Sequence, residues 1–165
     1  MKIQDIEEIY SGYSKQVFKY LFCLTHDYAL SEDLTQETFY IALKNIKQYR
    51  GECKLYVWLC QIAKNLWYKE LKKQKKINTI NIEDAQLISY ENIENSCISN
   101  LDLINKIKKL DQRTQEIIYL KITGELTFKE IGEILGISEN LARVSFYRGK
   151  QKIKEVDKDE KECKL

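Results

Sequence analysis

The sequence predicts an all-α protein of two small helical domains joined by a flexible linker, with the C-terminal domain a four-helix helix-turn-helix domain. The 165 residues include no proline and only six glycines, 32% are charged, and apolar residues recur at helical spacing. Domains commonly hold roughly 100 to 150 residues, so this length fits one ordinary domain or two small ones. Residues 77–99 lack sustained periodicity, which places the domains at residues 1–76 and 100–165.

The first domain is expected to contain three helices. Residues 6–24 carry an apolar stripe, and this first helix should end near His26. A second helix is expected from residue 27 or 31 to residue 48, with acid near its start, where the helix dipole favours negative charge. Gly51 interrupts the pattern, and a third helix is expected over residues 53–75. Its expected core residues are Leu55, Trp58, Leu59, Ile62, Ala63 and Leu66; those of the second helix are Leu34, Thr38, Phe39, Ala42, Leu43 and Ile46.

The segment 77–99 is predicted to be an acidic linker containing at most a short helical turn. No lysine or arginine occurs between Ile77 and Asn105, whereas acidic residues recur through that stretch. Helical periodicity then returns in four short pieces. They span residues 100–110, 111–121, 127–135 and 138 to about 155.

The last two of these helices carry the signature of a helix-turn-helix. Thr127 and Glu130 have the spacing of a capping box, in which each side chain satisfies a free backbone N–H of the other residue. Gly136 can adopt the left-handed turn that ends a helix, and Ser138 can cap the next one. Gly132 would let a neighbouring helix approach closely. Residues 127–155 are therefore predicted to place their second helix in the major groove of duplex DNA.

The second of these two helices has an apolar stripe and a polar, basic face. Its core stripe is expected to hold Ala142, Phe146, Gly149 and Ile153. Ala142 is small and Gly149 weakens a helix, so we expect this last helix to pack loosely or to bend. The opposite face carries side chains that can read base edges, while three nearby lysines can hold phosphates. The candidate base-reading residues are Asn140, Arg143, Val144, Tyr147, Arg148 and Gln151. A plain helical hairpin with a solvated charged face is the competing interpretation.

The end of the third helix combines lysines with aromatic residues. Between residues 62 and 76 there are six lysines and one acidic residue, Glu70. The aromatic side chains interleaved nearby are Tyr49, Tyr56, Trp67 and Tyr68. Bases stack on aromatic rings while lysines neutralise phosphates, so this combination suits single-stranded nucleic acid. A solvated lysine-rich helix end fits the composition equally well, and Trp58 is assigned to the core.

The second helix exposes an acidic face. Glu32, Asp33, Gln36 and Glu37 are expected on that face, which is unsuited to DNA. It fits a basic protein partner. A merely solvated acidic face is the alternative.

These segments together resemble the bacterial RNA polymerase sigma factors. Residues 31–39, SEDLTQETF, resemble the polymerase-binding motif, and residues 49–52, 57–59 and 62–65 are similar to the promoter-melting segment. Residues 110–153 resemble the last region of the family. Because the linker is too short for the middle domain of the large housekeeping members, the resemblance is to the extracytoplasmic-function (ECF) group.

This resemblance implies an alternative sigma factor that directs promoter-specific transcription initiation. The acidic helix would dock on the clamp helices of the largest polymerase subunit through Asp33, Leu34, Gln36, Glu37 and Phe39. Melted bases of the minus-ten element would be captured by Arg50, Gly51, Lys54, Lys64, Asn65, Tyr68 and Lys72. The base-reading face of the last helix would recognise the minus-thirty-five element as duplex. Members of the group are commonly inhibited by an anti-sigma factor, so a cognate one is expected.

An enzyme and a free-standing regulator are the competing function classes. A recombinase or transposase needs a positioned nucleophile with arginines, or a cluster of carboxylates that holds metal. Residues 1–76 contain only one arginine, Arg50, and one histidine, His26, so catalysis is poorly supported. Cys23 and His26 alone do not make a metal site. We therefore predict no enzyme, no metal and no cofactor. A dimeric duplex-binding regulator would explain residues 100–165 but leave the acidic and lysine-rich helices without a role.

The N-terminal residues and the cysteines indicate a cytoplasmic protein. Charged residues follow Met1 closely, with no apolar run that resembles a signal peptide or a membrane span. The chain is therefore expected not to insert into a membrane itself. Five scattered cysteines without a CxxC pair are expected to be reduced and mostly buried.

Overall fold

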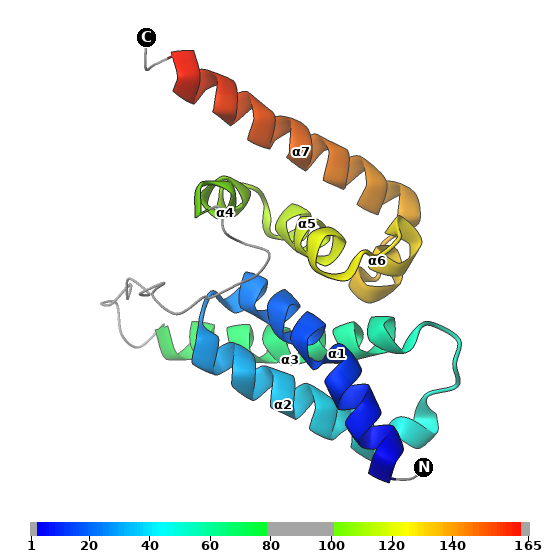
Figure 1. The fold of residues 1–165 in the computed structure, drawn as a ribbon. Helices are drawn as coiled ribbons and strands as arrows, with labels where there is room; N and C mark the ends of the chain where they lie inside the picture. Colours follow the sequence, from blue (N-terminus) through cyan, green and yellow to red (C-terminus); the bar gives the residue numbers. More distant parts are fainter. Residues whose placement is uncertain (1–2, 79–100, 163–165) are drawn as a thin grey trace. The chain divides into compact units, whose positions relative to one another are not determined.

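The computed structural model of the chain describes residues 3–78 and 101–162 (Figure 1). Over these two ranges the backbone forms seven α-helices, one 3₁₀ turn and no strand, which confirms the predicted all-α class. The helices cluster into two compact units: the first contains α1, α2 and α3, and the second contains α4 to α7. Beyond Asn78, the predicted linker and its helical turn lie outside the described residues.

The first unit is built from three helices that each pack against the other two. They are α1 (Ile3–Thr25), α2 (Tyr28–Lys44) and α3 (Leu55–Asn78), with a 3₁₀ turn, η1 (Ile46–Gln48), after α2. Their apolar faces meet in one core, which includes Val17, Tyr20, Leu21, Leu34, Phe39, Ala42, Val57, Leu59, Cys60 and Ala63. Two buried threonines of α2 satisfy their hydroxyls within the helix, because Thr35 and Thr38 each donate to a backbone carbonyl one turn earlier at 2.6 Å.

The start of α2 is set by Asp27, one of the two starting points that the sequence allowed. The Asp27 carboxylate accepts from the backbone N–H of Leu30 at 2.9 Å, as an N-cap does. Ser31 does not cap the helix but ties its first turn to the end of α1. Its buried hydroxyl lies 2.6 Å from the hydroxyl of Thr25 and donates to the Asp27 carbonyl. His26 takes a positive φ of 55° and reverses the chain where α1 was predicted to end.

The second unit contains the four predicted helices. They are α4 (Leu101–Lys108), α5 (Gln112–Gly124), α6 (Phe128–Leu135) and α7 (Glu139–Glu162). Helix α7 extends beyond the predicted end near residue 155, and it packs against α4, α5 and α6. The core of this unit includes Ile104, Ile107, Ile117, Leu120, Ile131, Ile134 and Ala142.

Gly149 is a close-packing position, so the expected loose packing at this residue is wrong. A Cβ at Gly149 would lie 2.6 Å from Thr114 Cγ2 and 3.0 Å from Ile118 Cδ1, both on α5. Helix α7 approaches α5 this closely because glycine has no side chain. Thr114 is itself held by the cap of α5, where its hydroxyl donates to Asp111 Oδ1 at 2.8 Å and its N–H donates to Oδ2 at 3.0 Å.

Candidate nucleic-acid interface

The turn between α6 and α7 has the geometry that its sequence predicts. The Thr127 hydroxyl accepts from the Glu130 N–H at 3.2 Å, and the Glu130 carboxylate accepts from the Thr127 N–H at 2.7 Å, which completes the capping box. Gly136 ends α6 with φ at 68°. Ser138 then caps α7 by accepting from the Leu141 N–H at 3.2 Å. The predicted helix-turn-helix is therefore present in full.

The missing side chain of Gly132 lets the turn between α6 and α7 pack closely on α6. The sequence predicted the close approach of a neighbouring helix instead. A Cβ at this position would lie 2.6 Å from the carbonyl oxygen of Ile137. The Ile137 N–H also donates to the Gly132 carbonyl at 3.0 Å. A side chain here would therefore push the turn away from α6 and change the angle at which α7 leaves it.

The predicted base-reading face of α7 is open to solvent. Five of its six candidates are exposed and Val144 is partly buried; the exposed five are Asn140, Arg143, Tyr147, Arg148 and Gln151. Ala142 and Gly149 are buried on the opposite side, whereas Phe146 and Ile153 are only partly buried. Lys150, Lys152 and Lys154 are also exposed and extend the basic surface along the helix. This face combines hydrogen-bonding groups for bases with cations for phosphates.

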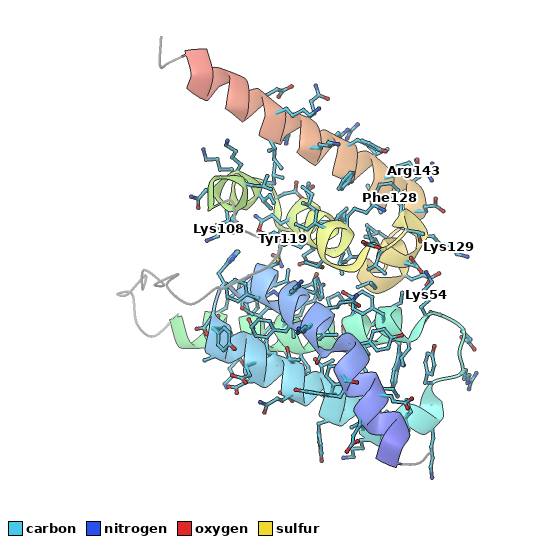
Figure 2. All side chains as sticks on the ribbon, viewed as in Figure 1. Lys54, Lys108, Tyr119, Phe128, Lys129 and Arg143 are labelled. Atoms are coloured by element: carbon cyan, nitrogen blue, oxygen red, sulfur yellow. The ribbon has the colours of Figure 1, made fainter. Side chains whose placement is uncertain are left out.

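An aromatic cluster supports the first turns of this face. The ring of Phe128, at the start of α6, lies 5.5 Å from that of Phe146 and 6.1 Å from that of Tyr147 on α7. Two cations approach Phe128: Lys121 Nζ at 4.9 Å and the Arg143 guanidinium at 5.8 Å from the ring centre. Figure 2 labels Phe128 and Arg143 near the turn between α6 and α7. The members of this cluster come from three separate helices, so their spacing in the sequence does not predict it.

Arg143 also forms an ion pair that was not among the predicted contacts. Its Nη2 donates to Glu139 Oε1 at 2.5 Å, between residues one helical turn apart. The signal was present in the sequence, since acid four residues before a cation is a favourable helical spacing. Arg143 is therefore paired with an acid on its own helix.

The loop between η1 and α3 holds the first group of predicted minus-ten residues. Tyr49 spans it, because its hydroxyl donates to the Cys53 carbonyl at 2.5 Å and its ring lies 5.2 Å from that of Trp58. Burial, together with the nearby Cys53 and Tyr13, raises the pKa of Tyr49, so the hydroxyl keeps the proton that it donates. Gly51 has φ at 74°, a conformation that side chains disfavour.

The exposed residues of this loop are arranged around that support. Arg50, Gly51 and Lys54 are exposed, and Arg50 forms a long, solvated ion pair with Glu52 at 4.0 Å. The loop therefore exposes two cationic side chains, Arg50 and Lys54, and the backbone of Gly51.

Helix α3 offers fewer aromatic rings for base stacking than predicted. Tyr56 and Trp67 are 6% and 8% exposed, so both belong to the core and their assignment to a stacking surface is wrong. The remaining candidates are accessible: Lys64 and Tyr68 are partly buried, whereas Asn65 and Lys72 are exposed. Among the aromatic residues of α3 predicted to stack on bases, only Tyr68 is accessible. The Lys64 ammonium lies 5.9 Å from the centre of its ring, so a cation stays beside it.

The acidic face of α2 is exposed as predicted. Glu32, Asp33, Gln36 and Glu37 lie on the solvent side, and Tyr40 is 65% exposed one turn after Gln36. Leu34 and Phe39 were predicted among the docking residues but are buried in the core of the first unit. In this structure they can support the face from behind and cannot contact a partner directly.

The three cysteines that the structure describes form no disulfide with one another. Cys23 and Cys60 are buried, and Cys53 is partly buried. Burial raises the pKa of the Cys60 thiol to about 12, so it behaves as a small apolar group. No cluster of three potential metal ligands occurs within the described residues. In the same part of the chain, no helix is both long and apolar enough to cross a membrane.

Comparison with protein families assigns both units. A model described as Sigma-70 region 2 matches residues 9–77, and one described as Sigma-70, region 4 matches residues 100–153. The ECF RNA polymerase sigma factor SigM of Bacillus subtilis (strain 168) is 32% identical over 153 residues, covering 90% of this chain and 93% of that protein. RNA polymerase sigma factor YlaC of the same organism is 29% identical over 161 residues, covering 93% of each chain.

The fold has a counterpart among solved structures. The sigma factor RpoE, in a co-crystal structure with the anti-sigma factor NepR from Bartonella quintana, matches with a TM-score of 0.76. The match covers 94% of this chain and 98% of that chain at 17% sequence identity. At this identity the match concerns the fold alone.

Proposed function

Because the chain belongs to the ECF sigma factors, as its motifs predicted, we propose that it binds RNA polymerase core, reads the minus-thirty-five duplex and captures melted minus-ten bases. The observation that carries this proposal is the separation of three chemically different surfaces. The base-reading face of α7 is basic and exposed, the loop before α3 presents cations around a rigid support, and α2 exposes acid. The proposed activity is non-catalytic and would take place in the cytoplasm.

The base-reading face of α7 supports duplex recognition. An α-helix fits the major groove of B-form DNA, and arginine, asparagine and glutamine can each form paired hydrogen bonds with one base. Asn140, Arg143 and Tyr147 lie in the first turns after the Ser138 cap, where recognition helices usually meet base edges. The lysines further along α7 would hold phosphates, which position the helix without selecting sequence.

The loop before α3 supports the capture of unpaired bases. Flipping a base out of the duplex costs a few kcal/mol, so a pocket that binds the flipped base must offset that loss. Gly51 leaves backbone room for a base, while Arg50 and Lys54 supply charge for the phosphates on either side. Lys64, Asn65, Tyr68 and Lys72 extend the same surface onto α3.

The acidic face of α2 supports docking to a basic protein surface. In our proposal Asp33, Gln36 and Glu37 contact the clamp helices of the largest polymerase subunit, and Leu34 and Phe39 hold α2 in place. Gel filtration of the chain with purified polymerase core tests this directly. We expect co-elution. A chain that binds duplex DNA but never co-elutes with core would favour the free-standing regulator instead.

Glu37→Lys tests the docking face at a single exposed residue. The change replaces an attractive charge with a repulsive one, so we expect run-off transcription to be lost while helical circular dichroism stays the same. Glu125→Lys makes the same charge change at an exposed residue of the second unit and should still co-elute with core. Unchanged transcription by Glu37→Lys would contradict the assigned docking face.

We further propose a cognate anti-sigma factor as a partner. The structural relative RpoE was solved with the anti-sigma factor NepR, and this chain shares its fold. An inhibitor of this kind would cover promoter-binding surfaces of the two units. Co-purification of the chain with a protein that blocks its co-elution with core would identify this partner.

A further inference from the structure

Arg143 is held from two sides before any DNA is bound. Its Nη2 donates to the Glu139 carboxylate at 2.5 Å, and its guanidinium centre lies 5.8 Å from the Phe128 ring centre. The two charged side chains are still 53% and 46% exposed, for Arg143 and Glu139 respectively. Part of the guanidinium therefore stays open to a ligand while its orientation is restricted.

We propose that Glu139 is a positioning residue that determines sequence specificity, because it orients Arg143 toward guanine in the minus-thirty-five duplex. This inference rests on the proposed function. A guanidinium is planar and carries its N–H donors in a fixed fork, so committing one of them to Glu139 directs the others. Orientation before binding reduces the conformational entropy that a long side chain would otherwise lose in the complex.

The same carboxylate disfavours contacts that carry no sequence information. A free arginine on this face would be attracted to any phosphate, which strengthens binding to every sequence equally. Glu139 compensates the charge of Arg143 and repels phosphates nearby. Discrimination therefore increases both through the favourable contact and through the suppression of nonspecific ones.

The experiment uses the full chain with polymerase core and a pool of duplexes whose upstream sequence is randomised. Bound sequences are selected and counted for each variant. Arg143→Ala identifies the position at which Arg143 prefers guanine. At that same position Glu139→Gln should lose roughly two- to tenfold of the preference, since fixing one flexible side chain is worth about that much. Glu139→Gln should also increase binding to the remaining, nonpreferred sequences.

Glu155→Gln is the matched control. It removes the same charge from the same helix, but Glu155 accepts from Gln151 at 3.0 Å instead of from an arginine. It should keep the guanine preference at the Arg143 position. An equal loss in this control would show a general charge effect and would overturn the proposal.

Combining Glu139→Gln with Arg143→Ala separates positioning from direct reading. Because Glu139 acts through Arg143, the double variant should discriminate no worse than Arg143→Ala alone. A further loss would mean that Glu139 reads a base itself, which would overturn the positioning role. An unchanged preference in Glu139→Gln alone would overturn it too. A wild-type chain that enriches no sequence would instead refute the proposed function.

Discussion

Gly149→Ala measures how closely α7 packs on α5. In an open helix interior this change stabilises by about 0.8 to 1 kcal/mol, because alanine has the higher helix propensity. At position 149 the new Cβ would lie 2.6 Å from Thr114 Cγ2 and 3.0 Å from Ile118 Cδ1, and overpacking of a core costs about 1 to 3 kcal/mol. The overpacking cost is the larger effect, so we expect a net loss of about 1 kcal/mol in the free energy of unfolding of the second unit.

The sign of this effect depends on Thr114, which cannot turn its methyl group away freely. Its hydroxyl is bonded to Asp111 at the cap of α5, so rotation of the side chain would break that bond. Amide hydrogen exchange of peptides from α5 and α7 in the full chain reports the stability of this unit separately. Adding Thr114→Ser to Gly149→Ala removes the obstructing methyl and keeps the hydroxyl, so it should restore protection.

Gly12→Ala is the control with the opposite expected sign. Gly12 lies exposed within α1 and has nothing within 4 Å of an added Cβ. This change should stabilise the first unit by roughly 0.5 to 1 kcal/mol. A Gly149→Ala chain as well protected as the wild type, or one that Thr114→Ser fails to rescue, would refute the close-packing argument.

Three further predictions concern hydrogen bonds at helix ends and in the loop. Burial raises the pKa of Asp111, but bonds from the Thr114 hydroxyl and N–H outweigh it and bring the pKa below the ordinary 3.8. The stabilisation by the Asp111 carboxylate is thus present above pH 3.8 and is lost as the pH falls through the lower pKa of the folded state. In Asp111→Asn the thermal unfolding midpoint should therefore fall less steeply at acid pH than in the wild type. An equally steep fall would contradict this. Tyr49→Phe removes the hydrogen bond to the Cys53 carbonyl, which is worth about 1 kcal/mol. It should slow promoter opening, measured by permanganate footprinting, without weakening binding to duplex DNA. An equal loss of promoter opening and of duplex binding would argue against a specific role of the loop in opening. Thr127→Ala should destabilise α6 by about 0.5 to 2 kcal/mol in hydrogen exchange, whereas Thr127→Ser should not.

The helix-turn-helix could be predicted from sequence because its geometry is decided locally. The Thr127 and Glu130 capping box, the left-handed Gly136 and the Ser138 cap each depend on residues within a few positions of one another. The start of α2 was narrowed by the same local chemistry to residue 27 or 31, and the Asp27 cap decides between them only in the structure. Local chemistry of this kind needs no knowledge of the tertiary fold.

Burial was less predictable because it depends on what packs against each face. Helix α3 packs against both α1 and α2, so Tyr56 and Trp67 are buried although they lie beside the lysines that suggested a nucleic-acid surface. In the second unit, Lys106 and Glu116 are buried despite their charge, and Glu116 accepts from Gln112 at 3.1 Å. From residue type alone, a lysine or a glutamate would be predicted at the surface.

The turn between α6 and α7 is built without any side chain of the base-reading face. Gly132 and Gly136 set its backbone, and Thr127 and Ser138 cap the helices on either side. Exposed residues of the face that lie outside the Phe128 cluster, such as Asn140 and Arg148, can therefore change without altering the turn that presents them. In evolution, this arrangement would let duplicated copies of such a chain acquire new target sequences by a few surface substitutions, each close to neutral for folding. The same modularity makes the face a practical starting point for engineering variants of the chain that each use a different promoter.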